Sequence, residues 1–172
     1  MIELIILAIL ILLNGLFTMS EIALVSARKS RLEAEADRGD RNARVALELA
    51  NRPELFLSAA QIGITLISIL TGFYSAEKFN VYLQPLIEKI GFLEHYAKTI
   101  STVIIVAIVT FLSIIFGELL PKRIGLLQAE QIAKIMAQPM KTFARITHPI
   151  VWLLNSVSRL FFRFFNIRLQ KD

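Results

Sequence analysis

Apolar residues fall into three long runs along this 172-residue chain. The first run covers about residues 2–25 and contains two glutamates, the second covers 55–74 without a charge, and the third covers 99–121 with one glutamate. About 20 apolar residues in a helix cross roughly 30 Å of hydrocarbon. The pattern therefore predicts an all-α membrane protein with three transmembrane helices.

The first run could also be read as a secretory signal peptide. Such a peptide begins with basic residues and ends at a cleavage site of small residues. This run begins Met-Ile-Glu and is followed by Arg28 and Arg31. We therefore expect a membrane helix that is retained.

The remaining segments are polar or amphipathic. Residues 28–52 mix basic and acidic side chains in a background of Ala and Leu, and we expect water-exposed helices interrupted near Gly39. Residues 76–98 are expected to form a short connection with an amphipathic helix. Residues 126–168 show apolar positions at helical spacing, and their two prolines are expected to break them into pieces.

A fourth span over residues 146–165 is an alternative interpretation of the last segment. It would contain Arg159 and Arg163, so a helix lying in the membrane interface fits better. Its basic residues would then lie at the headgroups, and Trp152 and the phenylalanines of 161–165 would dip inward. We expect juxtamembrane helices at about 28–52 and 126–168.

Composition and charge narrow the function classes. Hydrophobic residues make up 55% of the chain and the mean hydropathy is +0.61. The net charge is +5, but residues 122–172 alone sum to +7. No cysteine is present, and His95 and His148 are too distant in sequence to suggest a local zinc site. Nucleic-acid binding is not expected, because no soluble basic module is present.

The distribution of basic residues predicts the membrane orientation. Seven lie in 28–52 and nine in 122–172, against three between the second and third runs. Basic residues mark the cytoplasmic side. We therefore expect the N-terminus outside, the C-terminus in the cytoplasm, and a location in the plasma membrane, the bacterial inner membrane. The basic tail would face anionic lipids of the inner leaflet.

Each apolar run also has a polar or small-residue stripe at helical spacing. The stripes are Asn14, Thr18 and Glu21; Gln61, Thr65 and Ser68; and Thr110, Ser113 and Gly117. Small and hydroxyl residues can simply hold transmembrane helices together. Neutral amide and hydroxyl oxygens also suit a hard cation such as Mg²⁺. Both interpretations remain open, and the second fits best at Asn14, Thr18, Gln61, Thr65 and Ser68.

The sharpest local feature is Gly117-Glu118-Leu119-Leu120-Pro121-Lys122. Pro121 has no N–H, so the Gly117 carbonyl loses its helical partner. Within a membrane such a carbonyl is tolerated where it is buried against protein or lines a polar cavity. It is therefore a candidate cation ligand.

The glutamates near the membrane boundary have electrostatic or gating roles to consider. Glu118 could supply negative charge to a cation site or form an ion pair with Lys122 one turn later. Glu21 could pair with Arg28 or Arg123, which is the interpretation we favour for that residue.

Three motifs together resemble the transmembrane domain of the CNNM/CorC family (DUF21, hemolysin-like). They are Asn14-Gly15-Leu16-Phe17-Thr18-Met19-Ser20-Glu21, Gln61-Ile62-Gly63-Ile64-Thr65-Leu66-Ile67-Ser68, and Gly117-Glu118-Leu119-Leu120-Pro121-Lys122. They occur on consecutive predicted spans in the order of the family, and the resemblance covers nearly the whole chain. It implies one domain over residues 1–172.

The resemblance also implies a function and a ligand set. Family members are homodimeric magnesium transporters that hold Mg²⁺ between the three spans. Carried over, the ligands would come from Asn14 and Thr18, from Ser68 with Gln61 and Thr65 on its face, and from the Gly117 carbonyl. Relatives usually continue into cytoplasmic CBS domains that bind ATP, and no such domain occurs before Asp172. We expect the membrane portion of a longer protein.

The expected function is magnesium transport, with Mg²⁺ export by alternating access. A non-transporting membrane sensor or scaffold is the main alternative, in which the stripes only hold the dimer together. A membrane enzyme is not expected, because the spans contain no convergent nucleophile and base and no HExxH-type motif.

Overall fold

The computed structural model describes residues 1–164, apart from the side chains of residues 55, 92, 93 and 162–164. All the regular structure in this range is helical. The elements are α1 Ile2–Ser26, α2 Lys29–Asp37, α3 Arg41–Asn51, α4 Pro53–Glu88, η1 Gly91–Tyr96, α5 Ala97–Ile114, η2 Ile115–Leu119, α6 Leu120–Leu127 and α7 Ala129–Phe164. Of these, η1 is a 3-10 helix and η2 is a π-helix.

Three of these helical stretches are long and apolar enough to cross a membrane. They are Ile2–Ser26, Phe56–Glu88 and Glu94–Leu127, which confirms the three predicted spans. Between 17% and 33% of the residues in their most apolar windows are buried inside the molecule. The remaining apolar surface is far more than a soluble monomer exposes, as expected for helices surrounded by lipid.

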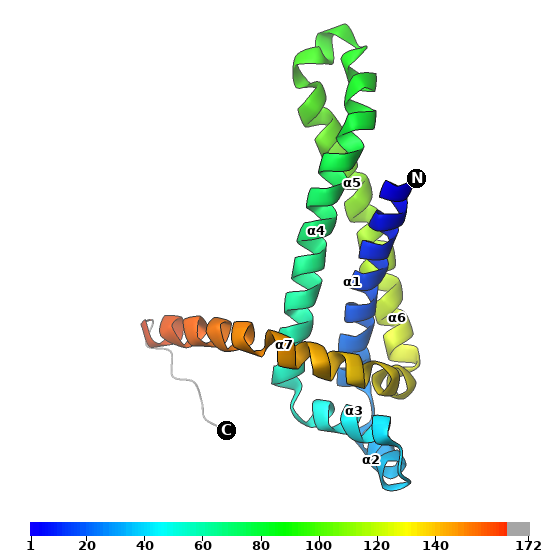
Figure 1. Cartoon of the computed structure of the whole chain (residues 1–172), viewed down its shortest axis with the longest axis vertical. Coiled ribbons are helices and arrows are strands. Elements are labelled where there is room, and N and C mark those ends of the chain that lie inside the picture. The colour runs from blue at the N-terminus through cyan, green and yellow to red at the C-terminus, as the bar shows by residue number, and fades with distance from the viewer. Residues whose placement is uncertain (165–172) are drawn as a thin grey trace.

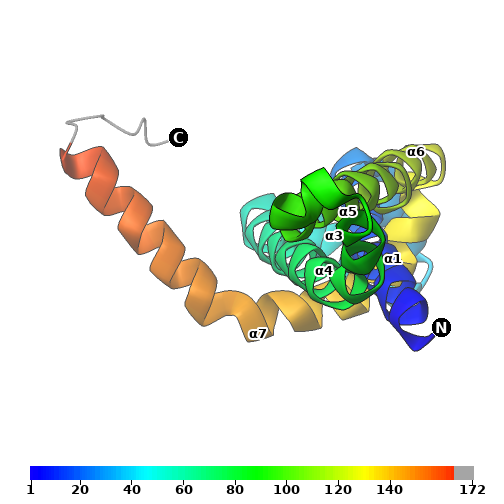
Figure 2. The same cartoon turned by 90° about the horizontal axis from the view of Figure 1, so that it is seen from above.

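The spanning helices stand side by side, and α2, α3 and α7 gather at one end of them (Figure 1). The hairpin that joins α4 to α5 lies at the opposite end. Seen from above, α7 extends well beyond the bundle (Figure 2). The charged helices are therefore collected on one side of the apolar helices.

The turn between α2 and α3 is set by local sequence. Gly39 adopts φ +96°, a left-handed conformation that favours glycine. Asp40 then caps α3, because its side chain accepts hydrogen bonds from the backbone N–H groups of Asn42 at 2.9 Å and Ala43 at 3.1 Å. The predicted interruption near Gly39 is confirmed.

The largest core lies where these helices meet the spans. Phe56 of α4 and Leu32 of α2 are fully buried in it. Leu24 near the end of α1 and Met140 of α7 are also buried there. The helices predicted to be water-exposed therefore expose their charges but bury an apolar face, which fixes them to the base of the bundle.

The second span is longer than the uncharged run that predicted it. α4 continues through the polar residues after Tyr74 to Glu88, with Pro85 inside it. The charged residues after Tyr74 end the apolar run in the sequence, but they do not end the helix. Pro85 removes one hydrogen bond only a few residues before the helix ends, so its cost is small. The expected separate connecting helix at 76–98 is instead the end of α4 followed by η1.

The last predicted segment is also more continuous than expected. Pro139 and Pro149 lie inside α7, so the prediction that they break it into pieces is wrong. A proline within a helix can kink it while the flanking turns continue. Figure 2 shows a bend in α7 between its two halves. Residues 165–168 of the predicted segment, Phe165 among them, lie outside the described range.

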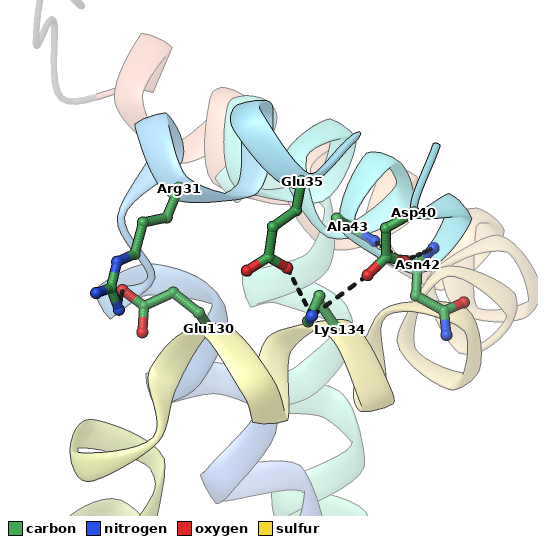
Figure 3. Close-up of polar contacts among 7 residues, drawn as sticks. All are labelled: Arg31, Glu35, Asp40, Asn42, Ala43, Glu130 and Lys134. Carbon is green, nitrogen blue, oxygen red and sulfur yellow. Dashed lines mark hydrogen bonds and ion pairs between the residues drawn. The ribbon is translucent and has the colours of Figure 1, made fainter. Parts of the chain in front are cut away.

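Ion pairs connect α7 to α2 and to the turn before α3 (Figure 3). The Lys134 Nζ lies 2.6 Å from the Glu35 carboxylate and 3.3 Å from the Asp40 carboxylate. Arg31 lies 3.8 Å from Glu130, in the first turn of α7. We refer to these residues as the α2–α7 ion-pair cluster.

Candidate functional site

A cavity of about 230 Å³ lies between α1, α4 and the third span, and we call it the central cavity. It is lined by apolar side chains and by a small set of polar residues. Its polar and glycine lining residues are Asn14, Ser68, Thr71, Gly72, Thr110, Ser113 and Glu118. Each of the three predicted stripes therefore contributes to one cavity.

Asn14 is the residue that links the three helices at this cavity. Its side chain is buried, with 9% exposure. The Asn14 Nδ2 donates a hydrogen bond to the Gly117 carbonyl at 3.3 Å, and the Ser68 hydroxyl donates to the Asn14 Oδ1 at 3.4 Å. Asn14, Ser68 and Gly117 thus lie together, as their predicted role as ligands requires.

The π-helix η2 and Pro121 together leave two backbone carbonyls of the third span without an α-helical donor. The Leu120 N–H donates to the Ile115 carbonyl, five residues back, instead of the Phe116 carbonyl four residues back. The next residue, Pro121, has no N–H to offer. Both the Phe116 and Gly117 carbonyls therefore lose their α-helical donor, where the sequence predicted only one.

Glycines let α1 approach this irregular turn closely. A Cβ at Gly15 would lie 2.9 Å from the Phe116 carbonyl oxygen and 2.9 Å from Pro121 Cγ. A Cβ at Gly117 would lie 3.1 Å from the Asn14 Nδ2. The contact between Asn14 and Gly117 therefore depends on two positions without side chains.

The other predicted neutral ligands lie away from the central cavity. The Thr18 hydroxyl is buried and donates to the Asn14 carbonyl at 3.1 Å, within α1. Gln61 and Thr65 are exposed and do not line the cavity. α4 packs against α1, α5 and α7, and this part of its stripe nevertheless stays exposed.

Glu118 and Lys122 form the expected ion pair at 2.6 Å. Glu118 also lines the central cavity, so the ion pair does not remove its carboxylate from the cavity. Glu21 makes no ion pair with Arg28 or Arg123 in the described part of the chain. Arg28 lies 4.0 Å from Glu130 instead, because the backbone becomes extended at Ala27 and leaves the axis of α1.

Thr71 was not among the predicted ligands, and Thr110 and Ser113 were expected to serve helix packing. Thr71 lies three residues after Ser68, so helical spacing alone could have identified it. Its hydroxyl donates to the Ile67 carbonyl at 2.7 Å. All three line the central cavity.

The chemistry of the lining suits a hard cation better than a transition metal. Within residues 1–164, no group of three or more His, Cys, Asp or Glu side chains could hold a metal ion. The lining side chains offer amide and hydroxyl oxygens and the Glu118 carboxylate. Gly117 is not a lining residue, and its carbonyl is linked to the cavity by its hydrogen bond from Asn14. Such donors favour Mg²⁺, Ca²⁺ or Na⁺ over zinc or copper.

The sequence of the chain matches a known protein family. The model of the cyclin M transmembrane N-terminal domain (CNNM) matches residues 5–172. The UPF0053 protein sll0260 of Synechocystis is 46% identical over 165 residues, covering 96% of this chain and 37% of that protein. The UPF0053 protein YhdT of Bacillus subtilis is 33% identical, covering 96% of this chain and 36% of that protein.

A third relative has a transport function in its name. The polyamine export protein of Escherichia coli K12 is 30% identical over 164 residues, covering 95% of this chain and 36% of that protein. The chain thus spans little more than a third of the length of these relatives. Their similarity supports a transport-related role in a membrane. The chain belongs to the CNNM family, as a cyclin M transmembrane N-terminal domain.

Proposed function

We propose that this domain transports Mg²⁺ across the plasma membrane, with the cation held in the central cavity. The observation that supports this most directly is the convergence of Asn14, Ser68 and the Gly117 carbonyl between three apolar helices. Polar groups in hydrocarbon are costly and generally functional. The domain is proposed to act as a transporter and not as an enzyme.

The proposed ligands are the Asn14 Oδ1, the Ser68 hydroxyl and the Gly117 carbonyl. A cation that binds both Asn14 and Gly117 requires the Asn14 amide to turn, because its Nδ2 now donates to that carbonyl. The Glu118 carboxylate would attract the cation. The ion pair between Glu118 and Lys122 would limit how tightly Glu118 holds that cation. Mg²⁺ gives up its water reluctantly, so several oxygens must replace its hydration shell.

Transport would proceed by alternating exposure of the cavity, with export as the proposed direction. Pro121 and the π-helix would serve as the deformable point of the third span. We further propose a homodimer with the N-terminus outside, with α2, α3 and α7 at the cytoplasmic face against anionic inner-leaflet lipids. Binding of ATP would belong to CBS domains of the whole protein.

Mg²⁺ flux in proteoliposomes that contain the full-length protein tests this proposal. Asn14→Ala and Ser68→Ala each remove one oxygen ligand and are expected to lower flux by about tenfold or more. Pro121→Ala restores an N–H donor to the helix and is expected to lower flux as well. Ser58→Ala is the matched control, since Ser58 lies on α4 outside the central cavity. Unchanged flux in the first three variants would refute the site.

A second candidate is export of an organic polycation. It is supported by the relative named a polyamine export protein and by the single carboxylate of the cavity. The same proteoliposomes distinguish the two candidates when they are loaded with either Mg²⁺ or a linear polyamine. Polyamine flux without Mg²⁺ flux would favour the second candidate.

A non-transporting sensor or scaffold is the third candidate. The extensive contacts between helices at the glycines support it, because the same small residues serve packing. A scaffold predicts no shift in thermal stability on adding Mg²⁺. A transporter's cation is expected to stabilise the state that binds it.

A further inference from the structure

A second cavity, of about 170 Å³, lies between the end of α3 and the middle of α7, away from the central cavity. Basic side chains surround it: Arg52, Lys141, Arg145 and His148. Buried Leu49 and Val151 form an apolar part of its lining. We call this the basic pocket.

The charges of the basic pocket are only partly neutralised. Glu48 is the one carboxylate in the lining, and it lies 2.6 Å from the Lys141 Nζ. Within the described side chains, Arg52 and Arg145 form no ion pair and no side-chain hydrogen bond. The three permanent cations, Arg52, Lys141 and Arg145, and the one carboxylate therefore leave a net charge of about +2. Two free guanidinium groups suit a phosphate, because each can donate two parallel hydrogen bonds.

The position of the pocket indicates where such a phosphate would come from. Arg52 immediately precedes α4, and the apolar span begins at Phe56, about one helical turn later. In Figure 1, α7 crosses the base of the spanning helices. Arg145 and His148 lie on one side of α7, and exposed Ile150 lies on the other. The pocket is thus at the level where lipid headgroups meet the span.

The apolar lining distinguishes a lipid from a free phosphate ion. Inorganic phosphate gains nothing from Leu49 and Val151, whereas the glycerol and first methylenes of a lipid can pack against them. The pocket volume is several times the roughly 30 Å³ that a water occupies in the liquid, so a phosphate group fits.

We propose that the basic pocket binds the phosphate of an anionic membrane lipid, with Arg52 and Arg145 as its ligands. The proposal rests on the proposed placement of α7 at the membrane surface and does not depend on which cation is transported. The Glu48 and Lys141 pair lies beside the phosphate and tunes the charge of the pocket. Lipid binding there would fix α7 against α3 and the start of α4.

Thermal-shift titration of the purified full-length protein tests the proposal, with short-chain phosphatidylglycerol, inorganic phosphate and short-chain diacylglycerol as separate probes. Phosphatidylglycerol is expected to stabilise the wild type, and the other two are expected to do so weakly. Arg52→Gln and Arg145→Gln are each expected to weaken the phosphatidylglycerol affinity about fivefold. Glu48→Gln is expected to strengthen it, a change that loss of folding cannot imitate.

Arg159→Gln is the matched control. Arg159 lies on the same side of α7 as Arg145 but outside the pocket, and it donates to the Ser156 hydroxyl at 3.0 Å. An equal loss of affinity in this variant would overturn the proposal, as would equal stabilisation by inorganic phosphate. Asn14→Ala is expected to bind lipid as the wild type does. A failure of the transport proposal would therefore leave this titration unchanged.

Discussion

At the scale of single residues, the site depends on positions without side chains as much as on polar groups. Gly15 allows α1 to touch the Phe116 carbonyl, and Gly117 leaves room for the Asn14 amide. Gly63 lies against the Phe17 ring in the same way. Small residues let transmembrane helices approach closely. Substitution of Gly15 or Gly63 should therefore disturb helix packing without removing any of the proposed ligands.

Gly15→Ala is expected to lower the thermal unfolding midpoint of the purified protein. The new Cβ would meet the Phe116 backbone and the Pro121 ring at 2.9 Å, a clash that costs about 1–3 kcal/mol. Gly72→Ala is the matched control, because a Cβ there meets nothing within 4 Å. Alanine is the better helix former, so this control should be neutral or slightly stabilising. Equal shifts in the two variants would contradict the packing argument.

At the scale of elements, α2, α3 and α7 are joined by an apolar core and by the α2–α7 ion-pair cluster (Figure 3). The pKa of Asp40 is held below its ordinary value, chiefly by the Ala43 N–H and also by Lys134 and the Asn42 N–H. The pKa of Lys134 is raised, chiefly by its hydrogen bond to Glu35. Partly exposed ion pairs contribute little individually, so the core supplies most of the stability.

The sign of the Asp40 shift gives a prediction for stability against pH. Because its folded pKa lies below the unfolded value of about 3.8, its contribution is complete above that pH and is lost as pH falls through the folded pKa. Asp40→Asn keeps an N-cap but removes the titration. The stability difference between wild type and Asp40→Asn is therefore expected to shrink as pH falls below 3.8, measured by thermal unfolding.

Asp37→Asn provides the control for this measurement. Asp37 is exposed at the end of α2. In the described part of the chain it forms no hydrogen bond or ion pair with Lys134. The variant removes the same charge near the same turn. The difference in stability between wild type and Asp37→Asn could shrink by the same amount as pH falls. That result would show that the loss of any negative charge near the turn, and not the titration of Asp40 at its cap, causes the effect.

At the scale of the whole molecule, charge and apolar surface are segregated along one axis. The charged helices lie at one end and the α4–α5 hairpin at the other (Figure 1). The basic residues follow this division, since fourteen of the nineteen lie in residues 28–52 and 122–164 of the described chain. Basic segments are retained on the cytoplasmic side. This division agrees with the proposed orientation, in which the charged helices face the cytoplasm.

Single cysteines can test this orientation, because the chain has none of its own. Glu94→Cys lies in the hairpin at one end, and Asn42→Cys lies at the start of α3 at the other. In intact cells, a membrane-impermeant maleimide is expected to label Cys at position 94 only. Position 42 should react after permeabilisation. Labelling of position 42 in intact cells would reverse the proposed topology.

The sequence was sufficient to predict features that depend on the covalent structure of single residues or on whether a segment prefers water or hydrocarbon. Run length and composition predicted the three spans, because hydrocarbon requires about 20 apolar helical residues. Gly39 predicted the turn before α3. Pro121 predicted a free carbonyl, because a missing N–H is a property of one residue. Helix ends were predicted less well, since α4 and α7 continue through prolines and charges.

Only the tertiary structure decided which polar residues meet. Asn14 and Gly117 are separated by 103 residues, and their contact depends on how α1 packs against η2. Ser68 reaches the central cavity while Gln61 and Thr65, on the same stripe, do not. Periodicity places residues on one face of a helix. Different elements pack against that face at different points along the helix, so only some of its residues reach the cavity. The sequence alone determined what crosses the membrane, and packing determined which oxygens line the site.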